Sequence, residues 1–221
     1  MTSQVTWMTR TSAGLALALA ACAGDIRPDD FQLGAGDPDA ATVEPGEDAA
    51  PPAKVEVADN GDGTSTVTVN ATSVTKWIYL DLTELAQVEP ADPLASADWD
   101  LGLQRFHYAL DGGVSGSGEG SLIVMDGAPL PDVNEAPADG WVTDEPDSTD
   151  DEDALPEYAF ETVEGGWYDY DPKNHQLTPK PRVYVVRGGT GALFALRIDA
   201  YYDGAGSPAW PSFTVKPLPA P

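Results

Sequence analysis

Cysteine, histidine and cationic side chains are scarce in this chain of 221 residues. It has one cysteine and two histidines, and 11 Lys and Arg residues stand against 37 Asp and Glu residues, which gives a formal net charge of -26. A single cysteine cannot form an internal disulfide, so the fold must depend on its own packed core. The strong negative charge repels nucleic acid and anionic lipid surfaces, which argues against nucleic acid as a partner.

Familiar catalytic motifs are also missing. The sequence has no Gly-x-Ser-x-Gly elbow, no phosphate-binding glycine loop and no His-Glu-x-x-His motif. Asp98 and Asp100 flank Trp99, and a carboxylate pair can hydrolyse glycosidic bonds. We favour a structural role for this pair at the start of a strand, because nothing else in the sequence supports hydrolysis. We therefore expect a protein that is not an enzyme.

The one long apolar stretch lies near the N-terminus. It runs from Ala13 to Ala21, follows Arg10 and ends directly before the single cysteine, Cys22. The stretch is too short for a permanent membrane span and is typical of a secretory signal peptide. Small residues before the cysteine predict a bacterial lipoprotein in which residues 1–21 are removed and Cys22 is acylated. An ordinary secreted protein with a cysteine at this position by chance is the alternative.

The residues that follow predict a tether and a domain. Ala23 stands where an Asp would signal inner-membrane retention, so we expect an outer-membrane lipoprotein of a Gram-negative bacterium, on either the periplasmic or the surface-exposed face. Residues 22–52 are rich in Asp, Glu, Pro and Ala, with few large apolar side chains, which predicts a disordered tether. Residues 53–221 are long enough for one domain with a hydrophobic core.

A second acidic block runs from Asp132 to Glu157 and contains no Lys or Arg. We interpret it as a solvated, mobile and dispensable loop within the domain, since the entropic cost of closing a loop grows slowly with its length. Capture of a divalent cation is the alternative.

Alternating apolar and polar residues predict strands along most of the domain. Residues 54–58 and 66–70 flank Asn60-Gly61 and Asp62-Gly63, a strong hairpin signal. In residues 98–110 the apolar residues change parity near Gln104 and Arg105, which predicts one strand with a β-bulge. No ten-residue stretch has a helical period. The pattern predicts a single irregular antiparallel β-sandwich-like domain. Further strands are expected at residues 76–82, 122–125, 166–170, 182–187, 192–202 and 212–215.

Three segments together resemble the HmuY family of haem-binding lipoproteins. They are residues 76–82, residues 98–105 running on to the Gly-Gly-x-Ser-Gly turn at 112–116, and a C-terminal set at 167–170, 175–179, 182–187 and 201–203. The flanking motifs look more like the environmental proteobacterial branch of the family. The resemblance implies an all-β outer-membrane lipoprotein that holds haem and passes it to a TonB-dependent receptor. A structural or adhesive lipoprotein of the same fold, without haem, is the alternative.

The resemblance implies two axial iron ligands but does not place them by motif. Side chains with suitable chemistry are His107, His175 and the softer Met125. Both histidines are expected at strand ends, where the loops of a rigid β-scaffold usually build sites. If the two loops meet at one rim, the imidazoles could ligate iron from opposite faces, although strand parity also allows an outward-facing His107. Tyr108, Tyr168 and Tyr170 would then stack on the porphyrin, and Arg105, Arg182 and Arg187 are the candidate partners of its propionates.

Overall fold

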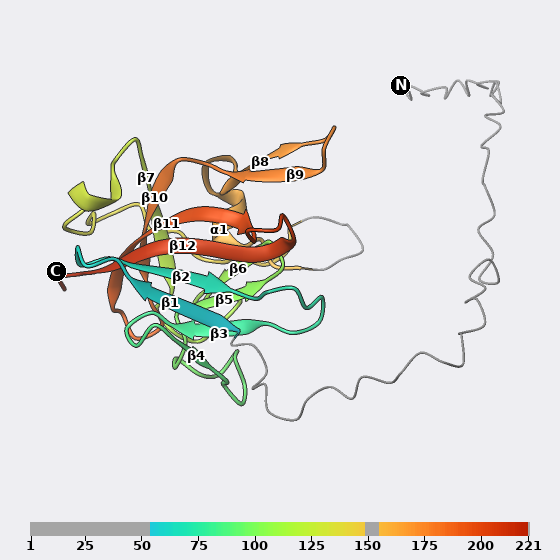
Figure 1. Ribbon diagram of the computed structural model, residues 1–221. Coiled ribbons are helices and arrows are strands. Elements are labelled where there is room, and N and C mark those ends of the chain that lie inside the picture. The colour runs from blue at the N-terminus through green and yellow to red at the C-terminus, as the bar shows by residue number, and fades with distance from the viewer. Residues whose placement is uncertain (1–53, 149–154, 221) are drawn as a thin grey trace, which may run out of the picture. The chain divides into compact units, whose positions relative to one another are not determined.

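The computed structural model describes residues 54–148 and 155–220 (Figure 1). The signal peptide, Cys22 and the tether predicted from the sequence lie outside the described residues, as does the centre of the acidic block at 149–154. The described chain consists mostly of antiparallel β-strands with a few short helical turns, which confirms the all-β prediction. No helix within residues 54–148 or 155–220 has the length and apolar character that crossing a bilayer requires.

The larger sheet has six antiparallel strands in the order β1-β2-β12-β11-β10-β7. Its first two strands form the hairpin predicted from the Asn-Gly and Asp-Gly pairs, with Val55 opposite Val69. Strand β1 is an edge strand and is exposed along most of its length. The six strands are β1 (Val55–Asp59), β2 (Ser65–Val69), β7 (Ser121–Asp126), β10 (Arg182–Arg187), β11 (Leu193–Tyr202) and β12 (Pro208–Leu218).

The smaller sheet has four strands in the order β4-β3-β5-β6. They are β3 (Ile78–Asp81), β4 (Ala86–Val88), β5 (Leu101–Gln104) and β6 (His107–Leu110).

The single bulged strand expected over residues 98–110 is wrong, because β5 and β6 form a hairpin in which Gln104 pairs with His107. Arg105, the first of the two turn residues, has a φ of 56°, the sign that a type II′ turn requires at that position. The parity change in the sequence therefore marks a tight turn.

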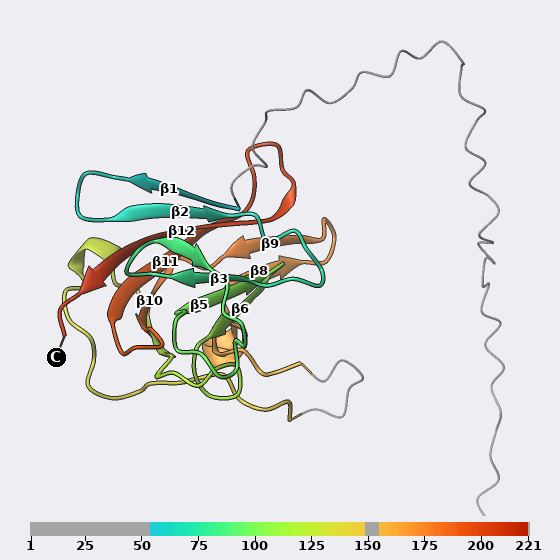
Figure 2. The ribbon, with the colours of Figure 1, turned by 90° about the horizontal axis from the view of Figure 1, so that it is seen from below.

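The two sheets pack face to face around the main core (Figure 2). In the smaller sheet, Ile78, Leu80, Leu101 and Leu103 point toward this core and are almost fully buried. Because side chains alternate along a strand, Tyr79, Gly102, Gln104 and His107 belong to the opposite, outer face. The large buried side chains from the six-stranded sheet include Val67, Tyr184, Val186, Phe194, Leu196 and Phe213.

A second apolar cluster covers the other face of the six-stranded sheet. It joins Leu130 and Val133 to Val183 and Val185 of β10, with Met125 packed against it. The acidic block is therefore anchored at its start, because Val133 is only 4% exposed. Asp144, in the middle of the block, is also buried. The expectation of a wholly solvated loop over residues 132–157 is too broad.

The third element is a two-stranded hairpin that extends from the sandwich (Figure 1). It consists of β8 (Tyr168–Asp171) and β9 (Gln176–Pro179), and follows the short helix α1 (Ala159–Thr162). A hydrogen bond from the Leu177 amide to the hydroxyl of Tyr202 in β11 (3.0 Å) holds β9 to the sandwich near the turn. The turn contains His175 and lies at the end of the hairpin away from the Tyr168–Pro179 pair.

Candidate functional site

His107 opens β6 and lies under the short helix α1. Its Nδ1 is 2.9 Å from Oε1 of Glu161, and the two side chains are about one fifth exposed, at 18% and 20%. A carboxylate can only accept a hydrogen bond, so Nδ1 carries the proton in this pair. In the neutral ring Nε2 then has a free lone pair. The arrangement leaves His107 with one nitrogen fixed and one available as a ligand.

Aromatic rings surround the His107 imidazole on the outer side of the hairpin. The rings of Phe106 and Tyr158 lie 4.1 and 5.4 Å from it, centroid to centroid. Tyr168 of β8 contacts Phe106 edge-on at 6.2 Å. This apolar wall is suited to a flat hydrophobic ligand, because aromatic side chains offer large apolar area in a rigid form.

His175 lies in the β8–β9 turn and has a φ of 54°. Its Nδ1 is 2.6 Å from the hydroxyl of Tyr170, and Tyr170 is 52% exposed. His107 lies near the base of the β8–β9 hairpin, because its neighbour Phe106 contacts Tyr168, the first residue of β8. His175 lies at the tip. At about 3.3 Å per residue, the four residues of β8 alone place the two ends about 10 Å apart. The structure does not bring the two histidines together.

Met125 lies in β7, at the edge of the six-stranded sheet, opposite Val183. Its side chain packs on the apolar cluster that covers the outer face of that sheet. It is therefore on a different sheet from His107 and surrounded by different residues.

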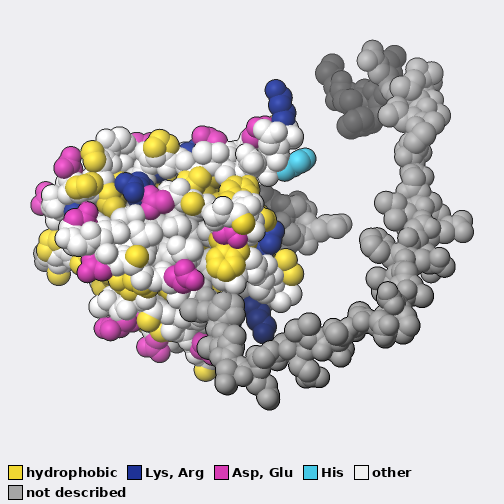
Figure 3. All heavy atoms as spheres, in the orientation of Figure 1, with side chains coloured by type: hydrophobic (Ala, Val, Ile, Leu, Met, Phe, Trp, Pro, Cys, Tyr) yellow, Lys and Arg dark blue, Asp and Glu magenta, His cyan; other side chains and the backbone are white. Residues whose placement is uncertain are grey.

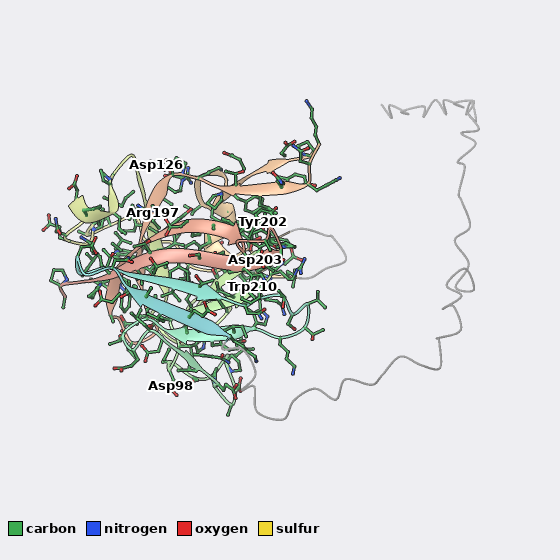
Figure 4. The ribbon with its side chains drawn as sticks, viewed as in Figure 1. Asp98, Asp126, Arg197, Tyr202, Asp203 and Trp210 are labelled. Atoms are coloured by element: carbon green, nitrogen blue, oxygen red, sulfur yellow. The ribbon has the colours of Figure 1, made fainter. Side chains whose placement is uncertain are left out.

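The three arginines predicted as propionate partners have separate environments. Arg182 pairs with Asp126 (labelled in Figure 4) at 3.0 Å. Its guanidinium also donates to backbone carbonyls. Arg187 stacks on the Trp141 ring, 4.1 Å from its centroid. Arg105 is in the hairpin turn next to His107 and donates only a long hydrogen bond to the Thr72 carbonyl (3.4 Å). Among the described residues no carboxylate pairs with Arg105, so it alone of the three is both close to His107 and open to an anion.

The three tyrosines predicted to stack on the porphyrin also lie in different parts of the structure. Tyr108 is fully buried and packs against Phe160 and Trp167 in the main core, so it cannot stack on a ligand at the surface. Tyr168 lies beside Phe106, and Tyr170 lies beside His175.

Sequence reasoning missed two groups of residues beside the outer face of the four-stranded sheet. Glu161 is 54 residues from His107 and belongs to a four-residue helix, so no spacing could connect them. Trp77, Tyr79, Trp99 and Tyr158 form an aromatic cluster on the outer face of the four-stranded sheet. The alternation of Trp77 and Tyr79 was a visible signal, since both must point away from buried Ile78.

A cavity of about 520 Å³ opens at the far end of the sandwich. Leu82 and Leu85 line it from the β3–β4 turn, and Phe194 and Val215 line it from the six-stranded sheet. It lies at the start of β11, whereas the His107 region adjoins the end of that strand through Trp167 and Tyr201. No lining residue is a histidine, methionine or cysteine, so the cavity offers iron none of its usual protein ligands.

Three buried aspartates hold loops to the sheets. Asp100 accepts hydrogen bonds from the Leu82 and Gly189 amides (2.7 and 2.9 Å). Asp98 is exposed and accepts from the Ser96 hydroxyl, so the Asp98–Asp100 pair does not act as one unit. Across the described residues no group of three or more His, Cys, Asp or Glu side chains is arranged to hold a metal ion.

Burial raises the pKa of all three aspartates. Asp144 accepts from the Leu110 and Ala159 amides (2.9 and 2.8 Å), and burial raises its pKa to about 6. Asp111 accepts from the Gly118 amide (3.0 Å), and burial raises its pKa to about 6 as well. These contacts are structural, because each carboxylate points into the fold.

Similar solved structures share this architecture. A candidate lipoprotein of Bacteroides fragilis NCTC 9343 is 21% identical, with a TM-score of 0.53 over 75% of this chain and 96% of that chain. An HmuY-like protein of Bacteroides vulgatus ATCC 8482, described as haem-binding, is 15% identical, with a TM-score of 0.51 over 73% and 96%. Apo PinO from Porphyromonas gingivitis is 16% identical, with a TM-score of 0.53 over 71% and 97%. At these identities the likeness shows a common fold.

Sequence comparison gives the family. No curated protein matches the chain. The family profile described as HmuY protein, however, matches residues 73–214, well over half of the sequence. The match includes the whole four-stranded sheet and, in the six-stranded sheet, β7, β10, β11 and most of β12. The chain therefore belongs to the HmuY protein family.

Proposed function

We propose that this chain is a haem-binding lipoprotein that takes part in haem or iron acquisition and catalyses no reaction. The observation that carries the proposal is the contact between His107 Nδ1 and Glu161 Oε1 at 2.9 Å. Histidines that bind metals commonly donate their second ring nitrogen to a carboxylate, which fixes the ring and raises its basicity. Membership of the HmuY family supports haem as the ligand.

The surroundings of His107 suit the other parts of a haem. Phe106, Tyr158 and Tyr168 offer apolar ring surface to a porphyrin. Arg105 offers a guanidinium to a propionate, and guanidinium groups bind carboxylates well. In a chain with 37 acidic residues an available cation beside a candidate ligand is uncommon. Figure 3 shows acidic side chains scattered widely over one face of the molecule and few basic ones.

The second axial position belongs, in this proposal, to His175. Its Nδ1 lies against the Tyr170 hydroxyl, so Nε2 is the nitrogen open to iron when Nδ1–H donates to the tyrosine oxygen. Joint ligation with His107 requires the β8–β9 hairpin to bend toward the sandwich. Within the described residues β8 and β9 pair with no other strand, so such movement would break no sheet hydrogen bonds, and it would strain the bond between the Leu177 amide and the Tyr202 hydroxyl. Met125 is the weaker candidate, since it is packed on the other sheet.

The proposal extends to the cell envelope. Acylation at Cys22 would anchor the domain in the outer membrane, and a TonB-dependent receptor would accept the haem. Three acyl chains hold far more firmly than one, since each buried methylene contributes about 0.8 kcal/mol. The likeness in fold to a candidate lipoprotein supports the lipid anchor.

The test is a haem titration of the chain without residues 1–21, carrying Cys22→Ser, followed by absorbance. Ligated low-spin haem should give a sharp Soret band with resolved α and β bands. His107→Ala should remove these bands, and His175→Ala should convert the spectrum to a high-spin form. Met125→Leu is the matched control and should change nothing. No haem spectrum in the parent protein would overturn the proposal in favour of a structural or adhesive lipoprotein.

A further inference from the structure

We propose that an aromatic pocket on the outer face of the four-stranded sheet binds a methylated ammonium group, such as the head group of choline. The pocket is lined by four rings, those of Trp77, Tyr79, Trp99 and Tyr158. His107 is not among the residues that line it, and the binding proposed here does not depend on haem. Quaternary ammonium ions are recognised in proteins by cages of this kind, through attraction between the cation and the negative ring faces.

The sequence builds the pocket from three separate segments. Trp77 and Tyr79 lie on the outer side of the β3 segment, Trp99 precedes β5, and Tyr158 precedes α1. Gly102 of β5 is directly opposite Tyr79. A Cβ at this position would lie 3.2 Å from Trp77 Cε3 and 3.3 Å from the Tyr79 ring. The glycine therefore lets both rings lie close over the neighbouring strand.

Two of the rings are nearly parallel, and each of the other two stands at a large angle to one of them. Trp77 and Tyr79 are nearly parallel, at 22° and 6.4 Å between centroids. Tyr158 stands at 57° to Trp77 (5.6 Å), and Trp99 stands at 63° to Tyr79 (4.8 Å). Trp99 is also fixed by its indole N–H, which donates to the Pro93 carbonyl at 3.0 Å. Between them is a hollow of about 130 Å³, the scale of a small head group.

The charge around the hollow favours a cation. None of the residues that line it is Lys, Arg, Asp or Glu, and the other lining residues are apolar except Ser115. The buried carboxylate of Asp144 accepts from the amide of Ala159, the residue after Tyr158 (2.8 Å), which places a carboxylate close to this wall of the pocket. An unmethylated ammonium group would lose its hydrating water here without gaining hydrogen-bond acceptors from the protein. A methylated ammonium group needs no acceptors, because methyl groups surround its charge. The chain as a whole has a net charge of -26.

The test is calorimetric titration of choline into the chain without residues 1–21, carrying Cys22→Ser, in the absence of haem. The uncharged isostere 3,3-dimethylbutan-1-ol has the same shape and should bind at least tenfold more weakly. Trp77→Ala should weaken choline binding at least tenfold, and Tyr79→Phe should retain it. Trp210→Ala, which removes a tryptophan from β12, is the control that should bind choline normally.

Two results would overturn the proposal. Equal affinity for choline and the neutral isostere would show an apolar hollow with no preference for charge. Absence of saturable choline binding, or binding that Trp77→Ala leaves unchanged while the melting temperature is retained, would show that these rings only cover the sheet.

Discussion

Glu161 holds Nδ1 of His107 at 2.9 Å although the two residues are 54 positions apart. Glu161→Gln replaces an acceptor that fixes the ring by an amide that can also donate to it. We expect haem affinity to fall by about 10- to 100-fold, the usual effect of losing such a partner of a metal ligand. Titration followed at the Soret band measures the change. Glu164→Gln is the control. Glu164 lies between α1 and β8 and has no side-chain contact with His107, so this change should leave haem affinity unaltered. Equal haem affinities in the two variants would contradict the role of Glu161 as the residue that positions His107.

Gly120 is expected to tolerate no side chain. A Cβ there would lie 2.4 Å from both the carbonyl carbon and the oxygen of Asp111, which are backbone atoms that cannot rotate away. We expect Gly120→Ala to lower the free energy of unfolding by about 3 kcal/mol, at the upper end of overpacking effects. Urea denaturation is the measurement. Gly204→Ala, which meets no atom within 4 Å, is the control and should be nearly neutral.

Stability should increase as the pH falls from 8 toward 5. Burial raises the pKa of Asp144 from 3.8 to about 6, so the folded state holds this proton more tightly than the unfolded state. Its stabilising contribution is complete below pH 3.8 and is lost as the pH rises through 6. The difference corresponds to about 3 kcal/mol. Asp111 acts in the same direction.

Asp144→Asn isolates this contribution, because an amide does not titrate. The variant should be less stable than the parent, since an Asn oxygen cannot accept both the Leu110 and Ala159 amides. Its stability should also change less between pH 8 and pH 5. Chemical denaturation across this range tests both statements, and a parallel pH dependence in the two proteins would show that the titrating group lies elsewhere.

Cys22→Ser should release the protein from membranes. The prediction depends on the small residues before the cysteine, which lies outside the described residues. Fractionation of cells that express the full chain, with detection by immunoblot, measures the shift to the soluble fraction. A variant that still sediments with membranes would contradict acylation as the anchor.

Most of the strands could be predicted from local sequence patterns. The β1–β2 hairpin follows from alternation on both sides of two turn pairs, and β11 follows from ten alternating residues. The β5–β6 segment was misjudged because its turn, Arg105-Phe106, contains no Gly, Asn or Asp. A positive φ at an arginine is rare, so the parity change favoured a bulge over a hairpin.

The site was less accessible to sequence reasoning because its contacts are long-range. Both histidines could be singled out, since they are the only two in the chain. The partner of His107 could not, because α1 has four residues and no periodicity. Asp144 looked like one more acidic loop residue. Its burial depends on two amide donors from β6 and α1, which only the folded chain brings within reach.

The position of β1 has a mechanical consequence. The chain enters the domain at Lys54, whose carbonyl accepts from the Asn70 amide at 2.7 Å, and Val55 then pairs with Val69. A force applied through the N-terminus therefore breaks the hydrogen bonds between β1 and β2 one pair at a time, starting at Lys54, rather than all of them together. Because β1 is mostly exposed, its detachment would uncover little of the core. Under tension the domain should lengthen by one strand first. The rings around His107 and the aromatic pocket lined by Trp77 and Tyr79 should then still be intact.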